Sequence, residues 1–239
     1  MREPHRSTGE ESASNTGRVY DGVETALRRA VLLGPPLVMA VLAAVHPTEH
    51  NQHDSVAALA PVAGDWTALH LALLPAAALV GVGLYSLVAP YRGPAALVAR
   101  VGIATYAFGA TVIDAVNGLA VGLFLTELEE ASVDPATVEP VLNGVFGGPV
   151  SALVGLLTIL GYAAGVLATS VVLRREGAPL TPLVGLVGST LGVVSHVGLT
   201  GVVGWLFLLG AVTWLTFGWR ASRQTREPRT TGTRASETD

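Results

Sequence analysis

The stretch VSALVGLLTILGYAAGVLATSVVL, residues 150–173, contains no charged side chain and ends against the pair Arg174 and Arg175. A helix needs about 17–25 predominantly apolar residues to cross a bilayer. This stretch has that length and composition, and it therefore predicts a transmembrane helix. Five other segments have the same character. The six predicted spans are residues 30–46, 66–89, 101–124, 148–173, 180–197 and 200–219.

The composition of the whole chain agrees with an all-α integral membrane bundle of six transmembrane helices. Only 13% of the 239 residues are charged, whereas a soluble domain carries about 25%. The 28 glycines suit helices that pack closely in lipid, where small residues let the backbones approach. Three G-x-x-x-G pairs, Gly118/Gly122, Gly161/Gly165 and Gly188/Gly192, predict such packing faces.

The arginines predict how the bundle sits in the membrane. All 14 basic residues are arginines, and they fall before the first span, between the second and third, after the fourth and after the sixth. The loops at 47–65, 125–147 and 198–199 contain none, and the first two carry acidic residues instead. Because positive charges favour the cytoplasmic side, we expect an N-in/C-in protein of the cell membrane.

The last two spans are separated only by a tight turn near HVGLTG, residues 196–201. If they formed a single span, the arginine-rich C-terminal tail would lie outside the cell, against the charge bias. Six spans are therefore preferred. The transmembrane domain, residues 30–219, is flanked by two polar segments, 1–29 and 220–239. These are expected to be disordered cytoplasmic tails because they have few apolar residues to bury.

Ionisable side chains inside spans are costly and are therefore candidates for function. The candidates are His46, His70, Asp114 and His196, with Asn117 as an uncharged companion of Asp114. They come from four predicted helices but share the outer half of the bilayer. His50 and His53 lie in the loop just above them, within HPTEHNQHD, residues 46–54.

Three interpretations of these residues remain open. Neutral imidazoles of His46, His50, His53, His70 and His196, together with Asp114, could bind Zn²⁺ or Cu²⁺. Alternatively, His70 and His196 on facing helices could be the axial ligands of a b-type haem. In the third interpretation, which we favour, the histidines satisfy backbone carbonyls near the helix ends. Asp114 then pairs with a histidine, a threonine or Asn117, which lies three residues further along the same helix face.

The chain resembles a known kind of protein in three places. His46–Pro47 closes the first span, DWTALHLALLP (residues 65–75) opens the second, and DAVNGLAVG (residues 114–122) lies in the third. These segments resemble small multi-helix membrane proteins of GC-rich bacteria and archaea, which belong mostly to families of unknown function. The resemblance implies a fold class and no activity.

The expected function follows from these observations. Walker A, HExxH and G-x-S-x-G motifs are absent, and no basic surface with interleaved aromatics suggests nucleic acid as a partner. We expect a non-enzymatic membrane protein whose partner is the lipid bilayer, with a polar pocket near the outer face around His70, Asp114 and His196. One alternative is a metal- or haem-binding membrane protein. The other is a small-solute or proton-coupled permease in which Asp114 titrates.

Overall fold

The computed structural model describes residues 8–47, 56–134, 137–195 and 197–219, and within these ranges the fold is all-α, without a β-strand. The helical elements follow one another along the chain. They are α1 (Thr8–Val45), α2 (Val56–Leu59), η2 (Ala60–Val62), α3 (Ala63–Val88), α4 (Pro94–Ile113), η3 (Asp114–Ala120), α5 (Val121–Glu130), α6 (Glu139–Phe146), α7 (Pro149–Arg175), α8 (Leu180–Gly188), α9 (Thr190–Val194), α10 (Gly198–Thr213) and η5 (Trp214–Trp219). The segments η3 and η5 are π-helical and η2 is a 3₁₀ turn.

Five stretches of helix are long and apolar enough to cross a membrane: Val23–Val45, Ala60–Val88, Pro94–Glu130, Glu139–Arg175 and Gly198–Trp219. They agree with five of the predicted spans and support a helical membrane bundle. The predicted span 180–197 differs, because it forms the shorter pair α8 and α9. At 1.5 Å per residue this pair is about 22 Å long, less than the ~30 Å of a bilayer core.

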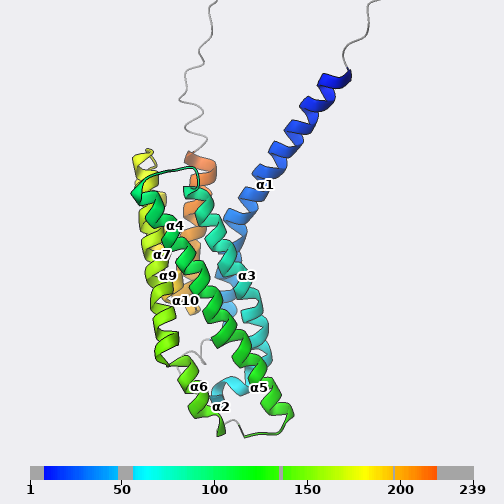
Figure 1. The fold of residues 1–239 in the computed structure, drawn as a ribbon, viewed down its shortest axis with the longest axis vertical. Coiled ribbons are helices and arrows are strands. Elements are labelled where there is room, and N and C mark those ends of the chain that lie inside the picture. The colour runs from blue at the N-terminus through cyan, green and yellow to red at the C-terminus, as the bar shows by residue number, and fades with distance from the viewer. Residues whose placement is uncertain (1–7, 48–55, 135–136, 196, 220–239) are drawn as a thin grey trace, which may run out of the picture.

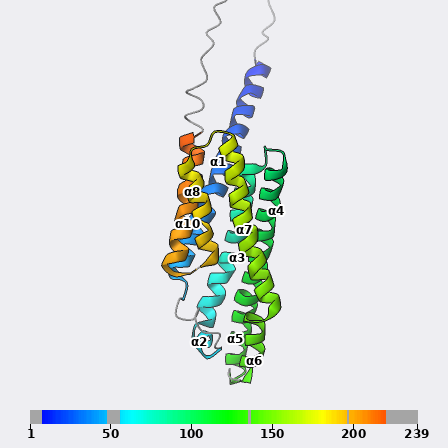
Figure 2. The ribbon, with the colours of Figure 1, turned by 90° about the vertical axis from the view of Figure 1, so that its left-hand side faces the viewer.

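A side chain explains why the fifth segment is interrupted. Ser189 lies between α8 and α9, where its hydroxyl donates to the Leu186 carbonyl at 2.5 Å and bonds the Tyr162 hydroxyl at 2.8 Å. Side-chain bonds of this kind compete with the regular helix ladder. The short helices then turn back into α10, and this hairpin stops well short of the end of the bundle formed by α2, α5 and α6 (Figure 2).

The first helix begins earlier than the sequence predicts. Helix α1 starts at Thr8 and extends beyond the other helices (Figure 1), whereas a disordered tail was expected to residue 29. Once a helix is nucleated by its apolar half, each added residue gains one hydrogen bond for one residue fixed. Polar residues ahead of a span can therefore continue it. Residues 1–7 and the predicted C-terminal tail, 220–239, lie outside the described residues.

The described arginines gather at one end of the bundle. The α3–α4 connection, the end of α7 and the end of η5 lie at one end, which carries the described arginines, and α1 projects beyond the bundle at the same end (Figure 1). We call it the arginine end. Arg100 fixes the α3–α4 connection there by donating to the carbonyl oxygens of Val88 at 3.3 Å, Ala89 at 3.0 Å and Tyr91. Which end faces the cytoplasm stays a prediction.

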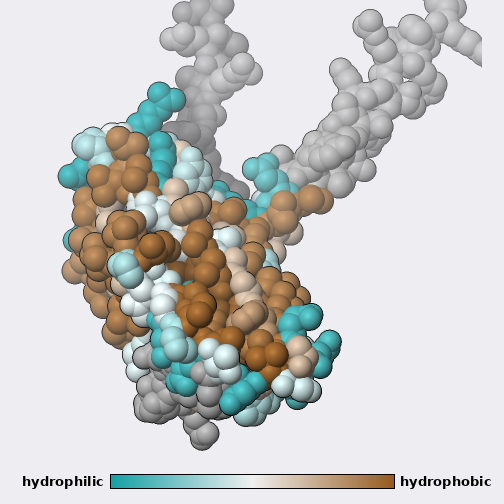
Figure 3. Space-filling model, turned by 60° about the horizontal axis from the view of Figure 1, so that its bottom comes forward, coloured by the Kyte–Doolittle hydropathy of each residue, from teal (hydrophilic) through white to brown (hydrophobic). Residues whose placement is uncertain are grey.

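The sides of the bundle are apolar and exposed, as contact with lipid requires. Large hydrophobic side chains point outward along the long helices, and Phe108 of α4 is 72% exposed. Figure 3 shows this apolar surface bounded by hydrophilic residues. A soluble protein rarely exposes so large an apolar patch, so the bilayer is the partner that this surface fits.

Glycines set the distances between the central helices. Helices α4 and α7 share the most extensive packing among the described elements. A Cβ atom added to Gly102 would lie 2.6 Å from the Gly161 oxygen and 2.7 Å from the Gly165 nitrogen. In the hairpin, one added to Gly204 would lie 2.5 Å from the Gly192 Cα. The predicted packing faces at Gly161/Gly165 and at Gly192 are thus confirmed.

Candidate functional site

The predicted third span contains a π-helical turn at the polar motif. Helix α4 runs into η3, which begins at Asp114, and η3 runs into α5. A π-helix pairs each N–H with the fifth residue back and is frequent at functional sites. Trp66 of α3 faces this turn, and its indole N–H donates to the carbonyl oxygens of Gly118 at 3.1 Å and Asn117 at 3.3 Å.

Close contact between α3 and η3 depends on Gly118. The His70 ring lies against the backbone of this glycine, and an added Cβ would overlap the ring atoms Cγ and Cδ2 and lie 2.6 Å from the His70 Cβ. One turn further on, a Cβ added to Gly122 would overlap the Thr67 hydroxyl. The predicted packing face Gly118/Gly122 is confirmed, and His70 and Thr67 are its partners.

Two of the predicted histidines meet in a buried aromatic cluster. His46 at the end of α1 is 3% exposed and His70 of α3 is 4% exposed. Their ring centroids lie 5.6 Å apart, and Trp66 contacts both, at 5.3 Å from His46 and 4.4 Å from His70. His70 Nδ1 lies 2.8 Å from the Trp66 carbonyl oxygen. Because a carbonyl can only accept, Nδ1 carries a proton and, in the neutral ring, Nε2 does not.

Asp114 lines a different site, a cavity of about 80 Å³ inside the bundle. Most of its wall is apolar and comes from α1, α3, α4, η3, α7, α9 and α10: Met39, Leu73, Ala77, Tyr106, Ala110, Ile113, Asp114, Thr158, Gly192, Val193 and Trp205. The Thr158 hydroxyl donates to the Val154 carbonyl at 2.7 Å. The remaining polar side chains of the wall are Asp114, Tyr106 and Trp205.

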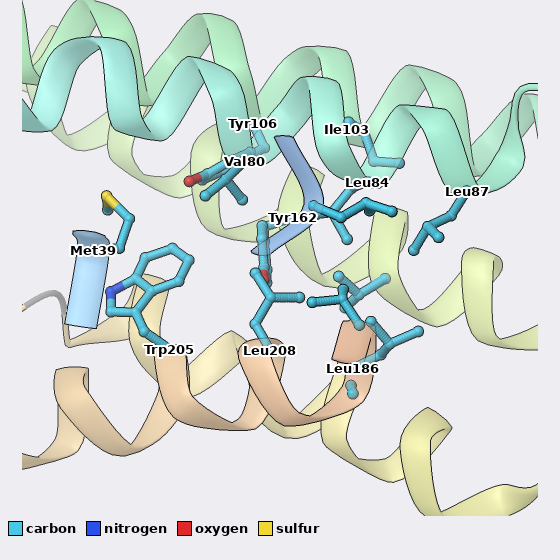
Figure 4. Packing of buried hydrophobic residues seen from close by; sticks show 14 of the residues in the cluster. Met39, Val80, Leu84, Leu87, Ile103, Tyr106, Tyr162, Leu186, Trp205 and Leu208 are labelled. Carbon is cyan, nitrogen blue, oxygen red and sulfur yellow. The ribbon is translucent and has the colours of Figure 1, made fainter. Parts of the chain in front are cut away.

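Two hydrogen-bond donors are buried at this cavity. The Tyr106 hydroxyl and the Trp205 indole nitrogen have no hydrogen-bond partner within the described ranges. Figure 4 shows both pointing to the side where Met39 lies. Edge-to-face aromatic contacts hold them in place, since Tyr162 contacts Tyr106 at 4.7 Å and Trp205 at 6.3 Å between ring centroids. We call Asp114, Tyr106 and Trp205, with the cavity between them, the Asp114 pocket.

The structure separates residues that the sequence grouped together. His46 and His70 lie together, Asp114 lies in its own pocket, and no group of three His, Asp or Glu side chains in the described part of the chain is placed to hold a metal ion. His50, His53 and His196 lie outside the described residues, so the six-residue metal site stays a prediction.

The expected pairing of Asp114 with Asn117 is absent. No hydrogen bond joins these two side chains, and the Asn117 Oδ1 atom is buried without a partner among the described residues. The π-helical turn explains the difference, because its wider turn moves residues three apart off a common face. Asp114 therefore faces the cavity, whereas the Asn117 backbone faces Trp66.

Sequence reasoning missed Tyr106, Tyr162 and Trp205. Tyrosine and tryptophan are common at membrane interfaces, where their polar atoms reach water. These three lie away from the span ends, where a buried O–H or N–H needs a partner inside the protein. Their depth in the spans was the available signal. Comparison of the chain with protein-family models, curated proteins and solved structures finds no match.

Proposed function

We propose that this chain is a non-enzymatic multi-pass protein of the cell membrane, with both termini cytoplasmic, that binds a small polar solute in the Asp114 pocket. The supporting observation is the pair of buried donors, Tyr106 Oη–H and Trp205 Nε1–H, on two residues that line the same cavity as the Asp114 carboxylate. The solute class follows from this set of groups. It carries an acceptor for the two donors and a donor or positive charge for Asp114.

Energetics favour an occupant over an empty cavity. Leaving a buried donor without a partner costs about 1–3 kcal/mol, and the pocket holds two such donors. A water molecule occupies about 30 Å³ in the liquid, so a cavity of about 80 Å³ admits a solute the size of two or three waters. Urea, formamide and acetamide have this size, and each carries a carbonyl oxygen that can accept from the two donors and an N–H group that can donate to a carboxylate. Most of the wall is apolar, so water molecules in the cavity would find few hydrogen-bond partners.

Tryptophan fluorescence tests this proposal, because Trp205 belongs to the pocket. The purified protein is titrated with urea, formamide and acetamide at millimolar concentrations. We expect a saturable change in emission with at least one of them. It should be lost in Asp114→Asn and in Tyr106→Phe.

Two controls assign the signal. Tyr85→Phe alters an exposed tyrosine of α3 and should leave the titration unchanged, whereas Trp205→Phe should remove the emission change. A linear response that survives Asp114→Asn would contradict the proposal. Failure of all three solutes to give a saturable change would contradict the proposed solute class.

A second candidate function is metal binding at His46 and His70. Histidines that bind metals usually donate their other ring N–H to a carbonyl or carboxylate. His70 makes such a bond to Trp66, and the His46 ring lies beside it at 5.6 Å. Further ligands would have to come from residues that the structure does not describe, His50, His53 and His196 among them.

Elemental analysis of protein purified without chelator tests this second function. We expect one zinc or copper per chain in the wild type and in His5→Ala, a histidine outside the predicted set, but none in His70→Ala. Stoichiometric iron would instead favour haem. A metal-free wild type would contradict both metal interpretations and leave the Asp114 pocket unaffected.

A further inference from the structure

An amphipathic cavity lies at the arginine end of the bundle, and it shares no lining residue with the Asp114 pocket. Its volume is about 500 Å³, and it is bounded by α1, the end of α3, the end of α7 and η5. Helix α1 leans away from the other helices at this end (Figure 1), which opens the space between them. The π-helical turn of η5 forms the facing wall.

Charged groups gather on one part of the cavity wall. Arg28 and Arg29 of α1 line it together with Glu24, so two guanidinium groups face one carboxylate and the net charge is positive. The Arg28 Nη2 atom donates to the Ser86 carbonyl at 3.1 Å, and the Arg29 guanidinium lies over the Phe217 ring at 5.1 Å from its centroid. These contacts hold both arginines at the cavity. A guanidinium has five N–H donors in a planar fork, which suits phosphate oxygens.

Four leucines form an apolar floor of the cavity. Leu32 follows Arg28 by one helical turn, so the two share a face of α1. Leu87, Leu173 and Leu215 continue the apolar floor from α3, α7 and η5. Because Leu32, Leu173 and Leu215 are buried, the floor is a ready-made apolar surface inside the protein rather than part of its outer face.

Aromatic side chains lie at the outer end of the cavity. Tyr91 and Trp219 line the cavity at the ends of α3 and η5. Tyrosine and tryptophan prefer the level of lipid headgroups in membrane proteins. Arg28 bonds Ser86 and Arg29 lies over Phe217, both deeper than Tyr91 and Trp219, whereas Leu32 lies one turn deeper than Arg28. The aromatic rings are therefore outermost, the guanidinium groups next and the leucines deepest, which suits a phospholipid whose phosphate lies under the rings and whose acyl chain lies on the leucines.

We propose that this cavity binds one anionic glycerophospholipid, with its phosphate at Arg28 and Arg29 and the start of an acyl chain on the leucine floor. Charge complementarity selects an anion, and the buried floor selects one that carries an apolar chain. Basic pockets between transmembrane helices bind anionic headgroups in this way. A free phosphate ion would use the arginines alone.

Thermal unfolding in detergent with added lipid tests the proposal. The full chain is mixed with phosphatidylglycerol, phosphatidylcholine or inorganic phosphate at equal concentration. Phosphatidylglycerol at tenfold above its dissociation constant should raise Tm by about 3–6 °C, and the other two should not. Native mass spectrometry should find one phosphatidylglycerol retained per chain.

Variants then locate the binding site. Arg28→Gln combined with Arg29→Gln should abolish the Tm shift and the retained lipid, whereas Arg92→Gln, an exposed arginine outside the cavity at the same end, should preserve both. Thr25→Glu places a negative charge on the exposed rim without removing a contact, and it should at least halve the shift. Thr181→Glu, the same change at an exposed position outside the cavity, should not.

Three results would overturn the proposal. One is a full shift in the double arginine variant, which would indicate general surface charge. Another is an equal loss in Thr25→Glu and Thr181→Glu. The third is an equal shift with inorganic phosphate, which would assign the arginines to a soluble anion. Thr25→Glu keeps the test decisive if the double variant fails to fold.

Discussion

Replacing Gly118 by alanine should destabilise the protein by driving α3 away from η3. The added Cβ would overlap Cγ and Cδ2 of His70 and lie 2.6 Å from its Cβ, so rotating the ring cannot remove the whole conflict. Trp66 and His46 also contact that ring. The helices themselves must therefore separate.

The size of the effect follows from three contributions. Overpacking a well-filled site costs about 1–3 kcal/mol. Separating the helices also weakens the Trp66 bond to the Gly118 carbonyl, and a hydrogen bond of this kind contributes about 0.5–1.5 kcal/mol. Alanine is better than glycine in a helix by about 0.5–1 kcal/mol, which offsets part of the loss. The net destabilisation should be about 2 kcal/mol.

Reversible unfolding in mixed micelles, followed by far-UV circular dichroism, measures this free energy. Gly210→Ala is the matched control, since Gly210 lies in α10 with nothing within 4 Å of an added Cβ, and it should be neutral or slightly stabilising. In a double-mutant cycle, Gly118→Ala should cost less in a His70→Ala background, where the ring is gone. Equal stability of Gly118→Ala and Gly210→Ala would refute the reasoning, as would a cycle without coupling.

Three further predictions follow from other contacts. Gly204→Ala should lower Tm more than Gly118→Ala does. Its added Cβ would lie 2.5 Å from the Gly192 Cα, a backbone clash that no side-chain rotation can relieve. A Tm equal to that of the wild type would contradict this. Tyr162→Phe removes the 2.8 Å bond to Ser189 and should cost about 1 kcal/mol in the same unfolding assay, with no additional loss in a background that already carries Ser189→Ala. Because the chain lacks cysteine, a single Ser132→Cys should react with a membrane-impermeant maleimide on intact cells, and a single Thr181→Cys only after permeabilisation; the reverse pattern would show that both termini lie outside.

The sequence predicted the helices that are marked by a long apolar run. It did not predict a break that depends on the contacts of a single residue. Charge-free runs such as residues 150–173 identified the long helices, because burial in lipid requires an unbroken apolar stretch. The fifth segment, which is broken at Ser189, could not be predicted in this way. Its break depends on the Ser189 hydroxyl bonding both Leu186 and Tyr162, and the second of these contacts is a tertiary one.

For the candidate site as well, the sequence identified some residues and missed those whose role depends on three-dimensional contacts. The rule that ionisable residues in spans deserve scrutiny identified His46, His70 and Asp114, and the structure buries both histidines. It could not predict that a π-helical turn separates Asp114 from Asn117, since three-residue spacing assumes α-helical geometry. Nor could it identify Tyr106 and Trp205, whose role depends on two helices facing one cavity.

The packing of α1 on α10 has a consequence for how the chain is made. The first helix to leave the ribosome finds one of its main neighbours in one of the last, and the two are separated by about 150 residues. At about 5–20 residues per second, that interval lasts roughly 8–30 s. During synthesis α1 can associate with α3 and lipid, but its α10-facing side stays uncovered until translation is nearly complete. Chains truncated before Gly198 would keep that side exposed, which would make them recognisable to membrane quality-control proteases.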